Sequence, residues 1–325
     1  MKTKYFLLIA FFTLFSTTAV LAQNTESPSE MSIDVMNRKG VALYQNGQYV
    51  EAVQWFRKAA EQGNANAQYN LGFCYDIGVG VEKSLDVAEI WYRKAAENGD
   101  MSAQYRLATI LYCFHYEVEK RSEGLKWYRK AAEQGHGEAA YDLGLYYHHS
   151  SKPINLPEAI KLYKKAADNG CYRGAISLGN LYYQGKEITR NYEEAANWYE
   201  QGAVLGNGDA QLALGICYML GNGVTQDCNK FIMWIQKAAE QDAKKAKLVL
   251  GVCYYCGIGV SRDTSKSLKL IKELSEGYYY NKSDVYFTLQ QFERNEPVSN
   301  VTFPGSYDKD FNKFLDYIMY EISKS

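Results

Sequence analysis

The sequence predicts an all-α protein, a right-handed solenoid built from stacked helix pairs. Three observations lead to this fold class. A short segment recurs about every 36 residues, apolar residues within each copy recur at helical spacing, and the residues between copies are of the types that end and begin helices. A constant period of this length is typical of units that each bury only part of a core and need neighbours to complete it.

The first 22 residues are predicted to be a cleavable signal peptide. Lys2 and Lys4 precede an apolar run of 11 residues (5–15), whereas a membrane-spanning helix needs about 20. Small residues up to Ala22 suit a cut ahead of Gln23. We therefore expect an exported protein, periplasmic or secreted, that has no membrane insertion after cleavage of the signal.

The charge balance of the chain gives no sign of a nucleic-acid partner. Without the two lysines of the signal peptide, 34 basic residues stand against 37 acidic ones, a formal charge of −3. Proteins that bind nucleic acids or anionic membranes by charge are strongly basic. These classes of partner are therefore not expected.

The first helix of each predicted pair carries the repeated segment AQYNLGFCY. Within its first copy, Ala67, Leu71, Cys74 and Tyr75 recur at the spacing of one helix face. A glycine follows the leucine in five of the six copies, and since glycine weakens a helix, its recurrence indicates close helix approach. The copies begin at intervals of 35 or 36 residues, at Ala67, Ala103, Ala139, Gly174, Ala210 and Ala246.

The second helix of each pair is marked by segments such as WYRKAAENG, and its start is predicted from capping residues. Residues of preferred N-cap types stand four positions before the place that Ala88 occupies in the first of these helices. They are Ser84, Asn155, Asn191, Asp227 and Asp263.

The connection between the two helices of a pair is a Gly-x-Gly-Val turn in three repeats, starting at Gly78, Gly221 and Gly257. Its glycines permit positive φ, and its valine can turn back into the core. This turn is lost at residues 115–118, 150–154 and 185–188, where we expect loops of different shape.

These segments resemble the Sel1-like repeat, a relative of the tetratricopeptide repeat (TPR). The resemblance covers residues 67–280 and implies six Sel1-like pairs. Residues 34–66 lack the long turn and look more like an ordinary TPR pair, preceded by a flexible segment at 23–33. Residues 281–325 are predicted to form a helical cap, because Ser306 can begin an amphipathic helix at the end of the stack.

The cysteines are predicted to be packing residues. Cys74, Cys217 and Cys253 share one register inside the first helix, and Cys253 and Cys256 form a C-x-x-C motif that lacks the helix N-terminus needed for redox chemistry. Some exported Sel1-like families carry a disulfide in each repeat, but the matching second-helix positions are alanines here. The histidines fit no metal spacing, so neither a metal site nor a cofactor is expected.

A non-enzymatic protein is predicted, although some exported Sel1-like proteins are described as weak penicillin binders or β-lactamases. The one S-x-x-K segment runs from Ser306 to Lys309 and has no S-D-N or K-T-G companion. A weak penicillin-binding enzyme and a structural spacer in an envelope assembly remain the alternatives.

The resemblance to TPR geometry implies a groove lined by the first helices, suited to a protein or peptide partner. The same positions become aliphatic in the last two repeats, as at Leu212 and Ile216, and the oligomeric state stays open. For the tyrosines at the first groove position the alternative is a bridge between neighbouring repeats. The predicted groove residues are Tyr69, Phe73, Asp76, Tyr105, Tyr112, Tyr141, His148, Asn180 and Tyr183.

Overall fold

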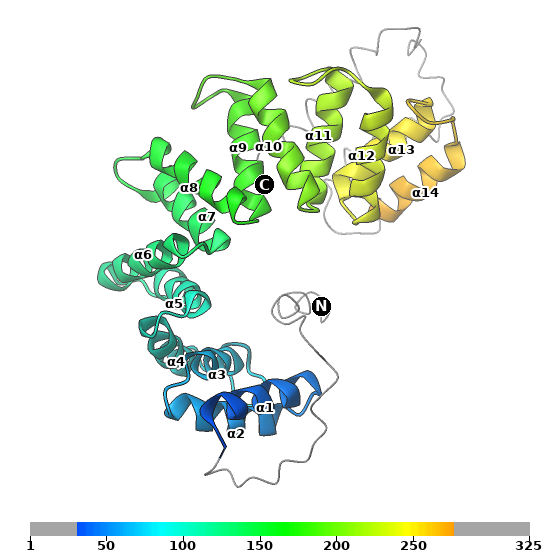
Figure 1. The fold of residues 1–325 in the computed structure, drawn as a ribbon. Helices are drawn as coiled ribbons and strands as arrows, with labels where there is room; N and C mark the ends of the chain where they lie inside the picture. The colour runs from blue at the N-terminus through cyan, green and yellow to red at the C-terminus, as the bar shows by residue number, and fades with distance from the viewer. Residues whose placement is uncertain (1–30, 276–325) are drawn as a thin grey trace. The chain divides into compact units, whose positions relative to one another are not determined.

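The computed structural model describes residues 31–275, which are helical throughout apart from short connections and contain no strand in that range. Successive helices along the chain form the pairs seen in Figure 1. The predicted all-α solenoid of helix pairs is confirmed. The helices are α1 Ile33–Gln45, α2 Tyr49–Glu61, α3 Ala65–Ile77, α4 Leu85–Glu97, α5 Met101–Cys113, α6 Val118–Glu133, α7 Gly137–Leu145, the π-helix η1 Tyr146–Ser150, α8 Leu156–Asp168, α9 Tyr172–Gln184, α10 Tyr192–Val204, α11 Gly208–Leu220, α12 Cys228–Glu240, α13 Lys244–Cys256 and α14 Thr264–Ser275.

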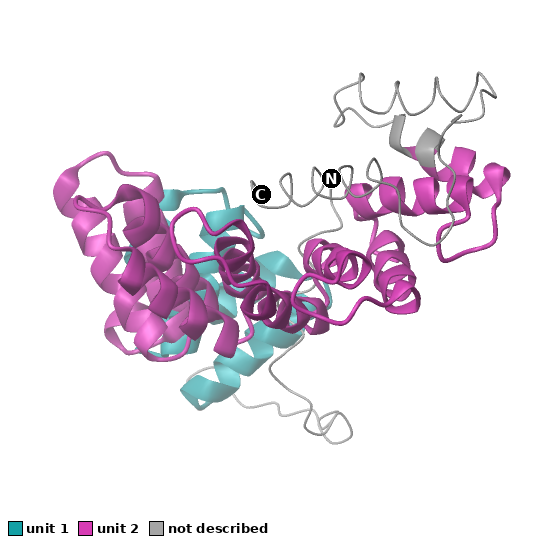
Figure 2. Ribbon diagram, turned by 90° about the horizontal axis from the view of Figure 1, so that it is seen from above, with its two compact units in different colours: residues 1–91 teal, residues 92–325 magenta. Residues whose placement is uncertain are grey.

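The described chain falls into two compact units that meet within α4, residues 31–91 and 92–275, coloured separately in Figure 2. In the first unit, Phe56 and Leu71 belong to a buried cluster formed by α1 to α4. In the second, Tyr199, Leu214 and Phe231 belong to a cluster that runs through the last three repeats. Each unit therefore has its own apolar core.

The predicted N-caps begin the second helices as expected. The hydroxyl of Ser84 accepts a hydrogen bond from the amide of Val87 (3.3 Å), next to the start of α4. The carboxylate of Asp227 accepts bonds from the amides of Asn229 and Lys230 at the start of α12. Because these side chains satisfy amides that a helix start leaves unpaired, local sequence fixes where each second helix begins. The other three predicted caps, Asn155, Asn191 and Asp263, make the corresponding bonds.

The two glycines of the Gly-x-Gly-Val turn have different roles. The first, as at Gly221, ends the first helix in the left-handed conformation with φ 71°. The second lies against the preceding pair, and at Gly80 and Gly223 it meets the backbone of that pair. A Cβ at Gly80 would lie 2.4 Å from the carbonyl oxygen of Tyr49, and one at Gly223 would lie 2.0 Å from that of Tyr192. Only glycine allows this approach, so the second glycine sets how closely adjacent pairs stack.

The glycines inside the first helices lie against aromatic rings of the second helices. A Cβ at Gly144 would lie 2.8 Å from the ring of Tyr163, and one at Gly179 would lie 2.5 Å from that of Tyr199. Both rings are fully buried. The predicted close helix approach is confirmed at these two pairs, and it places the hydroxyl of each tyrosine near the first helices.

Two of the three loops predicted to differ from the Gly-x-Gly-Val turn do differ. The loop at 185–188 begins as that turn does: Gly185 ends α9 in the left-handed conformation with φ 62°, as Gly221 ends α11. In repeat two, α6 begins at Val118 and has 16 residues, whereas α8, α10 and α12 have 13 residues each. In repeat three, α7 ends at Leu145 and continues as the π-helix η1. Since a π-helix is wider than an α-helix, the side chains within η1, including that of His148, point in other directions than they would in a continued α-helix.

Several sequence predictions lie outside the described residues. These are the signal peptide and most of the segment that follows it, the C-terminal helical cap, and the Ser306–Lys309 segment. Of the helices described, none combines the length and apolar character that crossing a membrane requires.

Candidate functional site

The predicted groove residues lie on the first helices of the pairs or, for His148, directly after one. Tyr69, Phe73 and Asp76 belong to α3 in the first unit. The rings of Tyr69 and Phe73 stack with 6.4 Å between centroids, and both are half-buried. The other predicted residues belong to the second unit, where three of them line one cleft and three do not.

Tyr105 connects repeat two to repeat three. Its hydroxyl donates to Asp142 (3.2 Å), and its ring stacks on His136 with 4.4 Å between centroids. Burial, then the nearby carboxylates of Asp142 and Glu138, raise the pKa of Tyr105. The structure thus gives Tyr105 the bridging role that was the alternative to ligand contact.

Tyr112 and Tyr183 are half-buried among other aromatic rings. The guanidinium of Arg121 lies 4.7 Å from the ring of Tyr112, whose edge meets Tyr146 of the next repeat. The hydroxyl of Tyr183 accepts a hydrogen bond from the amide of Asn222 (3.1 Å). Both side chains join neighbouring repeats, and neither lines the cleft.

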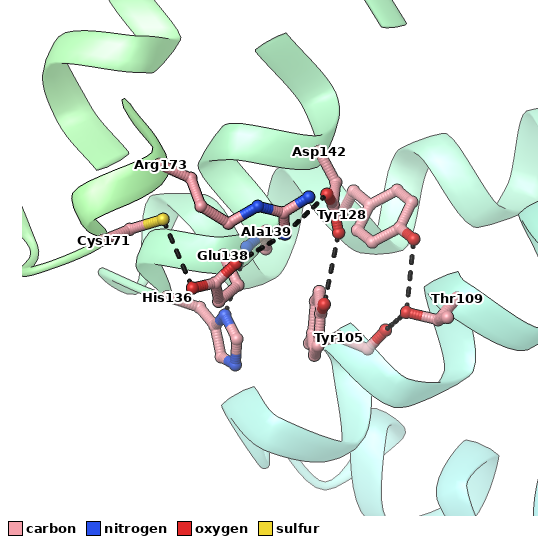
Figure 3. A network of polar contacts seen from close by, with 9 residues as sticks. All are labelled: Tyr105, Thr109, Tyr128, His136, Glu138, Ala139, Asp142, Cys171 and Arg173. Carbon is pink, nitrogen blue, oxygen red and sulfur yellow. Dashed lines mark hydrogen bonds and ion pairs between the residues drawn. The ribbon is translucent and has the colours of Figure 1, made fainter. Parts of the chain in front are cut away.

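Arg173 is the centre of a polar network that joins the third and fourth repeats (Figure 3). Its guanidinium donates to Glu138 (2.9 Å) and lies 3.6 Å from Asp142. It also lies 4.1 Å from the centroid of the Tyr141 ring. Although burial lowers the pKa of Arg173, the bond to Glu138 and the nearby acidic groups raise it overall. Arg173 therefore stays charged, and Glu138 and Asp142 balance its charge.

The same network extends to both sides of Arg173. The thiol of Cys171 donates to Glu138 (3.3 Å), and burial raises the pKa of this thiol to about 12. Burial also raises the pKa of Asp142, despite the opposing effect of Arg173. On the other side, the hydroxyl of Tyr128 donates to Thr109 (3.2 Å). Figure 3 shows these groups linked across three successive repeats.

A cleft of about 490 Å³ opens beside this network in repeats three and four. Its walls come from α7, η1, α8 and α9, from the loop after α9 and from the start of α11. It combines apolar side chains such as Leu145 and Ile176 with polar ones such as Ser177 and Gln184. Of the predicted groove residues, Tyr141, His148 and Asn180 line it.

His148 holds one wall of the cleft in place. Its Nε2 lies 2.6 Å from the carboxylate of Glu187, and its Nδ1 lies 3.0 Å from the hydroxyl of Tyr163. The ring of His149 stacks on it with 3.9 Å between centroids. Burial, and then His148, lower the pKa of His149, while burial and the nearby Tyr141 and Glu187 raise that of Tyr163. His149 and Tyr163 are therefore both uncharged at neutral pH.

Asn180 has a fixed orientation in the cleft. Its Oδ1 accepts a hydrogen bond from the hydroxyl of Tyr199 (2.8 Å). Because the oxygen is engaged, the donor end of the amide is directed away from Tyr199. Tyr141 is buried at 8% exposure beneath Arg173, so its contribution to the cleft is an edge of its ring.

The aliphatic inner positions of repeat five are not exposed, and this corrects the sequence-based expectation of a continuous open groove. Leu212, Ile216 and Met219 are all buried, as is Leu248 of repeat six. All four belong to the apolar core of the last repeats. Burying aliphatic side chains away from water is favourable, so the side chains at these positions pack in the core instead of lining a groove.

Sequence reasoning missed several residues of the site, chiefly Arg173, Tyr163 and Glu187. One signal was available, because Glu138 and Arg173 have opposite charges at the same register of consecutive repeats, 35 residues apart. No local sequence pattern indicated a role for Glu187, which contacts His148 although the two are 39 residues apart in the sequence.

The cleft offers both apolar surface and hydrogen-bonding side chains to a ligand. Of the cleft's charged lining residues, Arg173 is engaged with Glu138 and Glu187 with His148, while Lys186 and Asp209 complete the set. Within residues 31–275, no group of three or more metal-ligating side chains is placed to hold an ion.

The cysteines of the shared first-helix register occupy the positions expected of packing residues, whereas Cys113 is exposed. Cys74, Cys217 and Cys253 are buried as predicted, and all seven cysteines are free thiols in the structure. Burial raises the pKa of Cys74 and of Cys217 to about 12. Thiols with such pKa values are unreactive at neutral pH.

Comparison with known proteins identifies the repeats. The family model described as Sel1 repeat matches residues 35–64, 65–100, 102–136, 137–171, 173–207, 208–242 and 245–277. The first match is the pair that was expected to look like an ordinary TPR. No curated protein matches the chain significantly.

Two solved structures are similar over most of the chain. A Sel1 repeat protein from Oxalobacter formigenes is 31% identical with a TM-score of 0.62, covering 75% of this chain and 98% of that one. A protective antigen of uropathogenic Escherichia coli strains, described as displaying an SLR fold, is 25% identical with a TM-score of 0.70. That match covers 91% of this chain but spans only 62% of the antigen. On its seven matched repeats and these likenesses, the chain belongs to the Sel1 repeat family.

Proposed function

We propose that the protein is a non-catalytic adaptor of the cell envelope that binds a protein or peptide through the cleft of repeats three and four. Sel1-repeat solenoids generally serve as protein-interaction scaffolds, which supports the class of function. The signal peptide predicted from the first 22 residues supports the compartment.

The cleft is the observation that carries the proposal. Its volume of about 490 Å³ lies within the range typical of ligand sites. The exposed aromatic ring of Tyr172 supplies contact area, and Ser177, Asn180 and Gln184 supply hydrogen-bonding groups. Interfaces are enriched in this combination of aromatic and adaptable polar residues.

The charges of the cleft favour a ligand without a strong charge of its own, because its lining balances Arg173 and Lys186 against Glu187 and Asp209. Arg173 is held by Glu138 and Asp142, and Glu187 is held by His148. A charged ligand would have to compete with these contacts, and leaving a partly buried charge unpaired is costly. A neutral peptide segment can use the polar side chains without disturbing the pairs.

The test is capture of partners from envelope extract by the purified protein, compared with one variant that fills the cleft. Ser177→Arg places a long side chain in the cleft, whereas Asn197→Arg makes the same change on the exposed surface of α10 and serves as the control. We expect the first variant to lose the captured partner and the second to retain it. Equal capture by both folded variants would reject the cleft and favour a structural spacer.

Two further measurements test the remaining parts of the proposal. Hydrolysis of a chromogenic β-lactam by the purified protein would contradict a non-catalytic role. N-terminal sequencing of the protein recovered from the envelope fraction is expected to begin at Gln23, and recovery from the cytoplasm with an intact N-terminus would contradict export.

A further inference from the structure

The connection after α9 departs from the Gly-x-Gly-Val turns at the second glycine position. In three turns this position is Gly80, Gly223 or Gly259, where a Cβ would lie 2.4, 2.0 or 2.5 Å from an atom of the preceding pair. The connection after α9 keeps the first glycine as Gly185, but Glu187 occupies the second position. A charged side chain therefore stands where the other turns place a glycine against the preceding pair.

Glu187 contacts the preceding pair through His148. Its Oε2 lies 2.6 Å from Nε2 of His148, which belongs to η1 of repeat three. The connection is closed at its base by Arg190, whose guanidinium donates to the carbonyl oxygen of Gln184 (3.0 Å). The contact with His148 attaches the middle of this connection to repeat three.

The surroundings of His148 allow its ring to gain a proton without breaking that contact. Its Nδ1 lies 3.0 Å from the hydroxyl of Tyr163, and burial, followed by Tyr141 and Glu187, raises the pKa of this phenol. A neutral hydroxyl donates to an unprotonated Nδ1 and accepts from a protonated one, and Nε2 donates to Glu187 in both cases. Protonation therefore changes the strength of the contact and leaves its geometry intact.

The titratable groups around His148 come from every element that surrounds the cleft. Within η1, the ring of His149 stacks on His148 with 3.9 Å between centroids, and burial, followed by His148, lowers the pKa of His149. His149 therefore adds no like charge at mildly acidic pH. The groups that α7, α8, α9, the connection after α9 and α11 direct to the cleft are Tyr141, Tyr163, Arg173, Lys186, Glu187 and Asp209.

We propose that the contact between His148 and Glu187 is a pH-sensitive latch that fastens the connection after α9 to repeat three and so closes one wall of the cleft. Histidine changes charge between about pH 5 and 8, a range in which glutamate is ionised. As the pH falls through this range, the imidazole becomes positive opposite a carboxylate that is still negative, and a hydrogen bond between two charged groups is the stronger one. The latch is therefore strongest at mildly acidic pH. Its effect on binding rests on the proposed function of the cleft, whereas the latch itself is a property of the free protein.

Hydrogen exchange of the purified protein, followed by mass spectrometry at about pH 8 and about pH 5.5, tests the latch across the range in which histidine titrates. Because exchange itself depends on pH, the wild type is compared with Glu187→Gln at each pH. Glutamine keeps the shape and an acceptor but carries no charge. The side chain of Glu187 is 50% exposed, so the fold is expected to survive, and circular dichroism checks this.

Two connections of the same molecule are compared in each sample. Residues 185–191 report the latch, and residues 221–227, whose second turn position is a glycine, are the internal control. Each segment ends in a hydrogen-bonded amide, that of Asn191 or Asp227, which donates back to the first helix of its pair. A change confined to the first segment therefore reports on Glu187 and not on the general effect of pH.

We expect exchange of residues 185–191 to be slower in the wild type than in Glu187→Gln, by a factor that grows about threefold between the higher and the lower pH. The ratio for residues 221–227 should stay constant. In a His148→Gln background the growth should disappear, whereas in a His149→Gln background it should remain. A constant factor for residues 185–191, or growth that survives His148→Gln, would overturn the proposal.

These measurements separate the latch from the binding function, because exchange needs no partner while capture by Ser177→Arg reports on the cleft. A constant exchange ratio together with lost capture would reject the latch and retain the cleft as the binding site. A growing ratio together with unchanged capture would support the latch and reject that binding site.

Discussion

Alanine at Gly223 is expected to destabilise the stack far more than alanine at Gly206, although both glycines have positive φ. Their φ angles are 75° and 85°, so each alanine incurs the same conformational cost of about 1 to 2 kcal/mol. Part of this cost is offset because alanine also restricts the unfolded chain, by about 0.4 to 1 kcal/mol. Gly206→Ala should therefore lower the free energy of unfolding by about 1 kcal/mol or less.

The two positions differ in what the added methyl group meets. Nothing lies within 4 Å of a Cβ at Gly206. A Cβ at Gly223 would lie 2.0 Å from the carbonyl oxygen of Tyr192 and 2.5 Å from the amide nitrogen of Glu193. Both atoms belong to the backbone at the start of α10 and cannot rotate away, so the turn has to separate from α10. Overpacking of this kind costs about 1 to 3 kcal/mol, which gives a total loss of about 2 to 4 kcal/mol for Gly223→Ala.

Urea unfolding followed by far-UV circular dichroism measures both losses. Repeat arrays can unfold in steps, so hydrogen exchange of α10 and α11 should be measured beside the global transition. We expect faster exchange in these two helices for Gly223→Ala only. Equal losses for the two variants would refute the view that the second glycine of the turn is required for close stacking of neighbouring pairs.

Three further predictions follow from the local contacts. Asn191→Ala removes the acceptor for the amide of Glu194 and should cost about 1 kcal/mol of unfolding free energy, measured by urea titration; no change would contradict its capping role. Burial raises the pKa of Asp142, so the native state binds its proton more tightly than the unfolded state, and this contribution to stability is lost as pH rises through the native pKa. The stability of the wild type relative to Asp142→Asn should therefore increase as pH falls from 7 towards 4 in matched denaturation curves, and a difference that shrinks would refute the sign. An alkylating reagent should modify Cys113 in the folded protein but Cys217 only after unfolding, and mass spectrometry of the native reaction would contradict this if Cys217 reacted first.

The repeat architecture could be predicted from the sequence because its determinants are local. The N-caps at Asn191 and Asp227 act on amides two or three residues away, and the first glycine of each turn acts on its own backbone. A period of about 36 residues repeats these signals often enough that one eroded copy, such as the turn after α5, does not obscure the rest.

The site could be predicted only in part. The register selected Tyr141 and Asn180 on first helices and His148 directly after one, and the structure brings these three into one cleft. The same register also selected Tyr105 and Tyr183, whose hydroxyl groups are engaged with neighbouring repeats. The position of a residue on a helix face therefore does not by itself show whether its side chain is free to contact a ligand.

By itself the sequence determined the all-α class, the starts of five second helices and the burial of the shared cysteine register, because periodicity and capping chemistry act within one pair. Only the tertiary structure decided which inner positions remain open. Leu212 and Ile216 are buried, while Ile176 and Asn180 at the same registers of repeat four line a cleft. Exposure depends on how closely successive pairs approach and on contacts such as that of His148 with Glu187, which join residues a full repeat apart. Such contacts depend on the stacking of whole helices, which no single repeat encodes.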